Sequence, residues 1–440
     1  MLPPEKYSLT MISVMFIGHL GKLSLSSSSM ATSFAAVTGF TLMLGMGSAL
    51  ETFCGQTYGA KQYHMLGVHM QRAMLVLTLM GIPIALLWFF TEQIFSGLKQ
   101  DPKIAAGAGL YSRWLIPSIF PYGLLQCQIR FLQTQSITLP LLISSGITSL
   151  VHVFVCWLLV LRFDFGSKGA ALSIAISYWT NVLILAVYIN FSAAGRKTWT
   201  GFSKEGMKNL LNFLKLGVPS ALMVCLEDWS YEFLILMSGL LPNPKRETSM
   251  MSISLNTTSL IFRIPFGLGS AVSTRASNEL GAGKPKAAHL AARMVIFLSL
   301  IECLVVSSIL VLVRNIWGYI YTNEEEVVRY LAAIMPMLAL FNFIDGIQGV
   351  LSGTARGCGR QKIGAYVNLG AFYIVGLPSA AILTFVVHLG GKGLWLGITC
   401  GCSLQAFLLL VITLCTNWDE EAKKAMDGIY GSSTPANILS

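Results

Sequence analysis

The stretch GMGSALET at Gly45–Thr52 returns as GLGSAVST at Gly267–Thr274, and this repetition decides how the chain is organised. Over the sixteen positions that begin at Gly45 and at Gly267, seven residues are identical. The offset between the two stretches is close to half of the 440-residue chain. Self-similarity at a fixed spacing indicates an internal structural repeat.

Two further pairs of segments repeat at an offset near 220 residues. Gly166–Leu172 (GSKGAAL) resembles Gly390–Leu396 (GGKGLWL), and Ile116-Pro117 resembles Met335-Pro336. A composition rich in Gly, Ser and Ala can imitate one such match, but three matches in register are hard to imitate. The alignment of the two Pro residues makes Gln126 the counterpart of Asp345.

Long apolar segments fill both halves of the chain. Apolar residues make up 54% of the sequence and charged residues 11%, whereas an ordinary soluble domain has about 25% charged residues. A helix needs roughly 20 apolar residues to cross the hydrocarbon core of a membrane. The sequence therefore predicts an all-α polytopic membrane protein.

Twelve membrane spans are predicted, of which the first is abbreviated because only Ser8–Leu20 is available for it. The other eleven lie near residues 31–53, 72–91, 108–131, 137–161, 169–192, 214–240, 250–273, 288–313, 328–351, 364–388 and 393–416. Six spans thus repeat once. Since six is even, both halves enter the membrane from the same side. Transporters built from such parallel repeats bind solute between the halves and alternate access by rocking.

The predicted domains follow from these spans. Residues 1–192 form an N-terminal lobe of six spans, and residues 214–416 form a C-terminal lobe of six spans, pseudo-symmetric with the first. Residues 193–213 are a cytosolic linker, in which the apolar and basic residues of Ser203–Lys215 predict an interfacial amphipathic helix. Residues 417–440 are a polar cytosolic tail.

The net charge of +10 is explained by membrane topology. With both termini in the cytosol, seventeen Lys and Arg residues fall on the cytosolic side and ten on the opposite side. No basic stripe with interleaved aromatic residues is present, which argues against nucleic acid as a partner. We therefore predict cytosolic termini.

Acidic residues within the spans are the candidates for function. An ionised Asp or Glu at mid-bilayer costs about 3 kcal/mol on insertion scales, and such residues mark ion and substrate pathways. Glu227 in span 7 and Asp345 in span 10 are the leading candidates for proton coupling, although a packing role for Asp345 is the alternative. Glu302 and Glu51 fit helix packing better.

Other residues of the second half are candidates for lining a solute cavity or for a hinge. Pro219 lies eight residues before Glu227 and predicts a bendable point in span 7. Cavity-lining candidates are Asp228, Tyr231, Asn256 and Arg263, of which Tyr231 is the i+4 neighbour of Glu227.

Catalysis and metal binding find no support in the motifs. The six His residues form no HExxH pattern, and no GxxxxGK[ST] phosphate loop occurs. We expect no enzyme activity, no metal and no cofactor, with a proton gradient as the driving force. A membrane-embedded enzyme would need His or acid clusters near one membrane interface.

Several stretches of the chain resemble the multidrug and toxic compound extrusion (MATE) family, in detail its plant DETOXIFICATION branch. The matching stretches are Ile12–Gly21 (ISVMFIGHLG), Ala49–Tyr63 (ALETFCGQTYGAKQY), Cys225–Glu227 (CLE), Ser238–Pro244 (SGLLPNP), Ser273–Gly283 (STRASNELGAG), Asp345–Gly359 (DGIQGVLSGTARGCG) and Gly391–Trp395 (GKGLW). The resemblance covers residues 11 to about 430 and is highly specific because the motifs are long.

The resemblance implies a V-shaped transporter that exchanges protons for xenobiotics, alkaloids, flavonoids or organic cations, as a monomer in the plasma or vacuolar membrane. It also implies proton coupling by the acids that match Glu227 and Asp345. The family's first helix is longer than the one here. Two alternatives are a lipid-linked oligosaccharide flippase of the same superfamily, which needs a cationic cavity, and a passive channel, which needs no alternating access.

Overall fold

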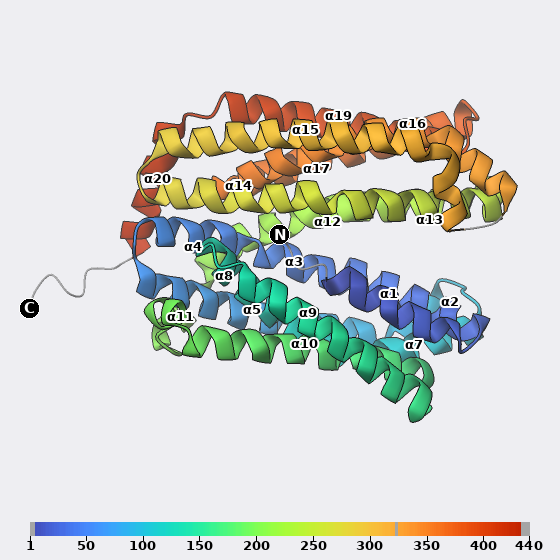
Figure 1. The fold of residues 1–440 in the computed structure, drawn as a ribbon, viewed down its shortest axis with the longest axis horizontal. Coiled ribbons are helices and arrows are strands. Elements are labelled where there is room, and N and C mark those ends of the chain that lie inside the picture. The colour runs from blue at the N-terminus through green and yellow to red at the C-terminus, as the bar shows by residue number, and fades with distance from the viewer. Residues whose placement is uncertain (1–4, 322–323, 433–440) are drawn as a thin grey trace, which may run out of the picture. The chain divides into compact units, whose positions relative to one another are not determined.

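A computed structural model of the chain describes residues 5–321 and 324–432, and the described residues form helices joined by short turns (Figure 1). Contacts divide the chain into two compact units, which we call the N unit (residues 3–221) and the C unit (residues 222–440). No residue in the described ranges is assigned to a β-strand. The prediction of an all-α chain is confirmed.

The N unit contains the first half of the repeat. Its helices, with π-helical and 3-10 turns labelled η, are α1 (Glu5–Gly18), α2 (Lys22–Ala35), η1 (Ala36–Phe40), α3 (Thr41–Gly47), α4 (Ala49–Gly59), α5 (Tyr63–Phe89), α6 (Thr91–Gly97), α7 (Pro102–Leu115), η2 (Ile116–Ser118), α8 (Ile119–Thr134), α9 (Leu139–Cys156), η3 (Trp157–Arg162), α10 (Gly166–Phe191), α11 (Ala193–Thr198), η4 (Lys204–Met207) and the first turns of α12 (Leu210–Ser238).

The C unit contains the second half of the repeat. It holds the rest of α12, then α13 (Pro244–Ile261), α14 (Arg263–Gly281), α15 (Pro285–Trp317), η5 (Gly318–Ile320), α16 (Glu325–Gly357), α17 (Gln361–Asn368), η6 (Leu369–Gly376), α18 (Leu377–Ala381), η7 (Ile382–Val386), α19 (Gly391–Leu414) and α20 (Trp418–Ser432). Within this unit α16 packs against α14, α15 and α19 and is its central helix.

Nine helical stretches within the described residues are long and apolar enough to cross a membrane. Three more helical stretches complete the predicted twelve: the short α1, Pro102–Thr134 (α7, η2 and α8) and Pro244–Gly281 (α13 and α14). Each unit thus holds six, counting α12 with the C unit. The last two stretches change helix partway along, at Ile116–Ser118 and near Arg263.

Backbone turns repeat between the units at the predicted offset. Left-handed φ angles occur at Lys61 (60°) and Gly283 (66°), and again at Ser136 (60°) and Gly359 (75°). The turns before α10 and α19 match as well, with φ of 55° and 61° at Asp164 and His388 and of 54° and 59° at Gly166 and Gly390. Since such angles are uncommon outside Gly, their recurrence confirms the internal repeat independently of residue identity.

The repeat corrects the predicted counterpart of Asp345. Pro102–Thr134 and α16 (Glu325–Gly357) match end to end at an offset of 223, which places Tyr122, not Gln126, opposite Asp345. Packing agrees, because a Cβ at Gly47 would lie 2.9 Å from Gln126 Cβ, and one at Gly269 would lie 2.6 Å from the oxygen of Gly349. The two aligned prolines misled the sequence comparison because η2 interrupts the first copy only. An acid is still present at this aligned position in the second half only.

The predicted amphipathic helix over Ser203–Lys215 is wrong. The segment forms η4, then an extended residue at Lys208 and a left-handed one at Asn209, before α12 begins. Gln71 of α5 holds the linker backbone instead: its Nε2 donates to Gly201 O (2.7 Å) and its Oε1 accepts from Ser203 N (2.9 Å). These side-chain hydrogen bonds hold the linker backbone in an irregular conformation. In a continuous helix the same backbone groups would bond to each other instead.

The boundary between the units falls inside α12, after Ala221 rather than before residue 214. The first turns of α12 pack within the N unit against α3, because a Cβ at Gly45 would lie 2.7 Å from Ala221 Cα and one at Gly217 would lie 3.3 Å from Met46 Cγ. Close approach of small residues is how helices associate in membranes. Span 7 therefore belongs in part to each unit.

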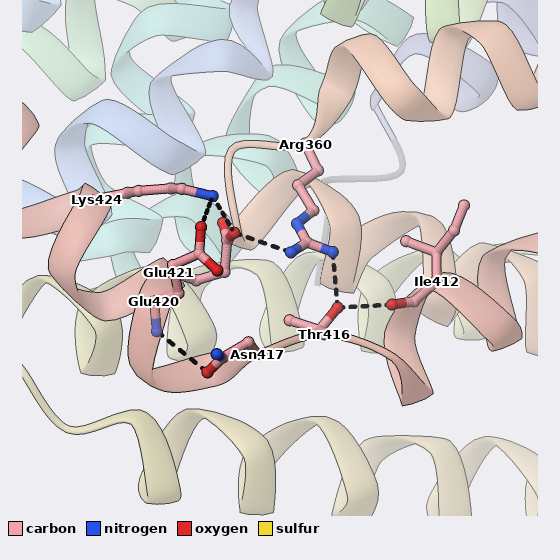
Figure 2. Close-up of polar contacts among 7 residues, drawn as sticks. All are labelled: Arg360, Ile412, Thr416, Asn417, Glu420, Glu421 and Lys424. Carbon is pink, nitrogen blue, oxygen red and sulfur yellow. Dashed lines mark hydrogen bonds and ion pairs between the residues drawn. The ribbon is translucent and has the colours of Figure 1, made fainter.

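The tail of the chain forms α20, which covers one end of the C unit (Figure 1). Trp418, Ala422 and Ala425 pack in a buried cluster with residues of α14, α15 and α16. Arg360, in the turn after α16, donates to Glu421 Oε1 and to Thr416 Oγ1, both at 2.8 Å (Figure 2). On the outer face, a hydrogen bond from Lys424 lowers the pKa of the exposed Glu420 carboxyl. The predicted polar tail thus includes a helix that fastens the turn after α16.

Replacing Arg360 with Ala is expected to lower the free energy of unfolding by about 1–3 kcal/mol, because the buried Glu421 loses the closer of its two charged donors and keeps only Lys424, at 3.3 Å. The measurement is thermal unfolding of the purified protein in detergent. Arg329→Ala is the matched control, since Arg329 pairs with Glu325 where both side chains are at least 69% exposed and such pairs contribute little. Equal melting temperatures for the two variants would contradict the role given to Arg360.

Candidate functional site

Glu227 lies at the centre of a group of amide side chains in the C unit. Its Oε2 accepts from Gln348 Nε2 of α16 at 3.0 Å, from Gln405 Nε2 of α19 at 3.4 Å and from Asn368 Nδ2 of α17 at 3.5 Å. Gln405 also donates to Asn368 Oδ1 at 2.7 Å. Four helices therefore contribute polar side chains to one point in an otherwise apolar bundle.

Asn368 also fixes the backbone of α12 beside this acid. Its Nδ2 donates to the oxygen of Met223 at 2.7 Å, which is one helical turn before Glu227. Asn368 and Gln405 are completely buried, and Gln348 nearly so. Buried amides need hydrogen-bond partners, and here each amide bonds to a group on a helix other than its own. The network therefore sets the position of Glu227 relative to α17 and α19.

Asp345 is buried on α16, one turn before Gln348. Its Oδ1 accepts from Cys402 Sγ of α19 at 3.8 Å. Asp345 and Glu227 are close enough for their charges to interact. The structure thus brings together the two acids that the sequence singled out, although 118 positions separate them.

Tyr231 and Asp228 belong to the same neighbourhood. Tyr231 is close enough to Asp345, Glu227 and Asp228 to interact with their charges, and its ring makes edge contacts with Phe341 and Phe372. Asp228 lies on the exposed side of α12. Arg356, at the end of α16, is the cation whose charge reaches Glu227.

The remaining predicted residues lie on α12, α13 and α14. Asn256 is in the middle of α13, and Arg263 is the first residue of α14, where the two helices of span 8 meet. Both stay predictions as cavity-lining residues. Pro219 lies within α12, two residues before the boundary between the units. A hinge at Pro219 likewise remains a prediction.

Sequence reasoning missed Gln348, Asn368, Gln405 and Cys402. The criterion for proton coupling was an acidic side chain within a span, whereas these four residues are neutral. Asn and Gln inside strongly apolar spans would have been a usable criterion, because an amide in hydrocarbon must find a partner. No group of three or more His, Cys, Asp or Glu side chains suited to a metal occurs in the described part of the chain.

Close packing of α14 against α16 holds Asp345 and Gln348 in place. A Cβ on Gly353 would collide with the backbone oxygen of Gly269, and a Cβ on Gly357 would lie 2.7 Å from the oxygen of Ser273. Gly349 and Gly353, spaced four residues apart, form the small-residue stripe that lets two membrane helices touch through their backbones. The side chains of α16 that face away from α14 are therefore rigidly placed.

The amides suit an acid that changes protonation state. Each amide has both a donor and an acceptor group, and the Oε1 atoms of Gln348 and Gln405 are buried without a hydrogen-bond partner. With Glu227 ionised, the NH₂ groups donate to it. With Glu227 protonated, rotation of one amide turns an oxygen toward the acid's O–H. The site can therefore satisfy both forms of Glu227 without moving a helix.

Comparison with known proteins identifies the family of the chain. The family model for MatE matches residues 6–158 and 219–382, which is most of both units. The chain belongs to the MatE family. Protein DETOXIFICATION 16 of Arabidopsis thaliana is 57% identical over 98% of this chain and 88% of its own length. Protein DETOXIFICATION 14 of the same plant is 47% identical over 97% of this chain and 88% of its own length.

Solved structures of MatE proteins have the same fold. The crystal structure of the eukaryotic MATE transporter AtDTX14 matches with a TM-score of 0.93 and 46% identity, covering 97% of this chain and 96% of that one. An outward-facing multidrug resistance MATE family transporter matches with a TM-score of 0.84 at 16% identity, over 94% and 92% of the two chains, which shows the fold alone. The protein is therefore an integral membrane transporter of the MATE fold, in a family named for detoxification and efflux.

Replacing Gln405 with Leu is expected to change the pH at which transport is half-maximal by about one unit, since a hydrogen bond to a charged group contributes about 1.5–3 kcal/mol. The measurement is transport rate against pH in reconstituted vesicles. Ser403→Ala on the same helix is the control, because among the described residues Ser403 Oγ bonds only to the oxygen of Thr399, one turn earlier. Identical pH profiles for both variants would remove Gln405 from the proton-binding network.

Proposed function

We propose that this MatE protein exports small organic solutes in exchange for protons, and that Glu227 and Asp345 bind the proton. The observation that carries the proposal is that Glu227 accepts from a buried group of amides while Asp345, on another helix, is close enough for the two charges to interact. Intramembrane acids are rare and mark ion pathways. In a transporter, two acids at one point are suited to couple ion binding to solute movement.

Exchange follows from the competition of two cations for one pair of carboxylates. When both Glu227 and Asp345 are ionised, they repel each other at close range. Either a proton or an organic cation relieves this repulsion, so the two bind in alternation. Protons that enter from the acidic side then release the solute there. The protonated pair returns and releases its proton on the cytosolic side.

The solute is proposed to be a hydrophobic organic cation or a neutral aromatic compound, such as an alkaloid or flavonoid. Asp228 supplies negative charge near the acid pair, and Tyr231 supplies an aromatic surface. We further propose a monomer in the plasma or vacuolar membrane, with the solute as its binding partner besides lipid. The proton gradient drives the cycle, without a cofactor or an enzymatic step.

Uptake of fluorescent organic cations into inside-out vesicles tests the function. A pH gradient alone is expected to drive accumulation, and a sodium gradient alone is not. Accumulation with sodium, or equal rates with and without either gradient, would sink the proposal. The second of these outcomes is the one a passive channel predicts. A panel of cations and neutral flavonoids in the same assay gives the solute class.

A further inference from the structure

Glu302 is an acid within a membrane span that the proton-exchange site does not use. It lies near the middle of α15 (Pro285–Trp317). In the most apolar stretch of this span, only 17% of the residues are buried inside the protein. Of the residues one turn away from it, Leu298 and Val305 are each 51% exposed, whereas Ser299 is buried. These apolar side chains face lipid, so Glu302 is at the edge of the lipid-facing surface.

The carboxyl of Glu302 has few polar neighbours. Its Oε2 accepts from Cys303 Sγ at 3.4 Å, and its Oε1 is buried without a hydrogen-bond partner. The nearest cations along α15 are Arg293 and Arg314, which are about 14 Å and about 18 Å away along the axis at 1.5 Å per residue. An ionised carboxylate at such a place costs about 3 kcal/mol. The surroundings therefore suit the neutral acid.

Glu302 is nevertheless coupled to the helix that carries Asp345. The next residue, Cys303, touches the Cα of Gly346 so closely that a Cβ at Gly346 would collide with Cys303 Sγ. One turn earlier, Ser299 Oγ donates to the oxygen of Gly346 at 3.2 Å. A bulky group attached at Glu302 would therefore press on the contact between α15 and α16 beside Asp345.

We propose that Glu302 is a lipid-facing carboxylic acid, separate from the Glu227–Asp345 pair, that apolar carbodiimides reach through the bilayer and modify. The inference concerns the reactivity of one side chain and does not depend on proton exchange. The titratable groups near Glu302 are Cys303 and, across the α15–α16 contact, Asp345.

The reaction needs only the acid and the reagent. The carboxyl proton passes to one nitrogen of the carbodiimide, and the carboxyl oxygen bonds to the central carbon to give an O-acylisourea. The acyl group then moves to the adjacent nitrogen and leaves a stable N-acylurea whose mass is the sum of both reactants. Because lipid excludes the water that would hydrolyse the intermediate, the apolar setting favours the stable product.

The test treats the full-length protein in lipid nanodiscs with dicyclohexylcarbodiimide and locates the adduct by peptide mass spectrometry. The adduct is expected on the peptide that contains Glu302 and is expected to be absent in Glu302→Gln. A water-soluble carbodiimide of equal concentration is expected to leave Glu302 unmodified while it labels the exposed Glu325. No adduct at Glu302, or equal labelling by both reagents, overturns the proposal.

A transport assay examines the consequence of the adduct. Glu302→Gln is expected to transport at the rate of the unmodified protein, and dicyclohexylcarbodiimide is expected to slow the unmodified protein several-fold more than Glu302→Gln. Equal inhibition of both proteins would mean that the inhibitory adduct forms elsewhere and would overturn the coupling of Glu302 to α16. The labelling result stands apart from transport, so a failure of proton exchange would leave it unaffected.

Discussion

Transport driven by a pH gradient is expected to fall by about tenfold or more when Asp345 is replaced by Asn, because a difference of 1.4 kcal/mol in proton binding already corresponds to tenfold. Glu227→Gln is expected to behave in the same way. Both amides imitate the protonated acid but cannot release a proton. The remaining transport should no longer depend on the direction of the gradient.

The measurement is gradient-driven uptake in reconstituted vesicles, with the melting temperature as the test for intact folding. Asp427→Asn is the matched control, since it makes the same chemical change on the exposed face of α20. Amide variants that transport like the unmodified protein would exclude Glu227 and Asp345 from proton coupling. A loss confined to one variant would assign the coupling to that acid alone.

Replacing Gly353 with Ala is expected to give a large loss of stability of the C unit. The new Cβ would meet the backbone of Gly269, including its Cα at 2.6 Å, and backbone cannot rotate away. Overpacking typically costs about 1–3 kcal/mol when side chains can adjust, and more is expected here. The variant should show a lower melting temperature and a lower yield from membranes.

Gly370→Ala is the control for this experiment, because a Cβ at Gly370 would meet nothing within 4 Å. It carries the same change in composition and lies in the same unit. If the Gly353 and Gly370 variants unfold at the same temperature, the α14–α16 backbone contact is not as close as described. Since α16 bears Asp345 and Gln348, residual Gly353→Ala protein should also transport slowly.

Much of the fold could be predicted because the membrane imposes it. Apolar length gives the spans, and the matching Gly-rich stretches give the two halves. The residue-by-residue alignment of the two halves was harder to predict. The Pro117 and Pro336 pair gave the wrong offset, since local changes such as η2 shift one copy by a few residues without altering the ends of the span.

The candidate site could be predicted for its acidic members and for Tyr231, but not for its amides. Glu227 and Asp345 are costly in a membrane and so are visible in the sequence. Gln348, Asn368 and Gln405 are much less costly, and their importance depends on three helices meeting at one carboxylate. The conformation of the linker could not be predicted for a similar reason, because its backbone bonds to Gln71, which is far away in the sequence.

The wide π-helical turns bear on the ancestry of the chain. A π-turn accommodates one additional residue in an α-helix. Such turns, η3 (Trp157–Arg162) and η7 (Ile382–Val386), precede the matching loops of both units, whereas η6 (Leu369–Gly376) lies where α9 is regular. The shared turn is therefore expected in a six-helix half before it was duplicated, whereas the turn at η6 reflects a change confined to one copy.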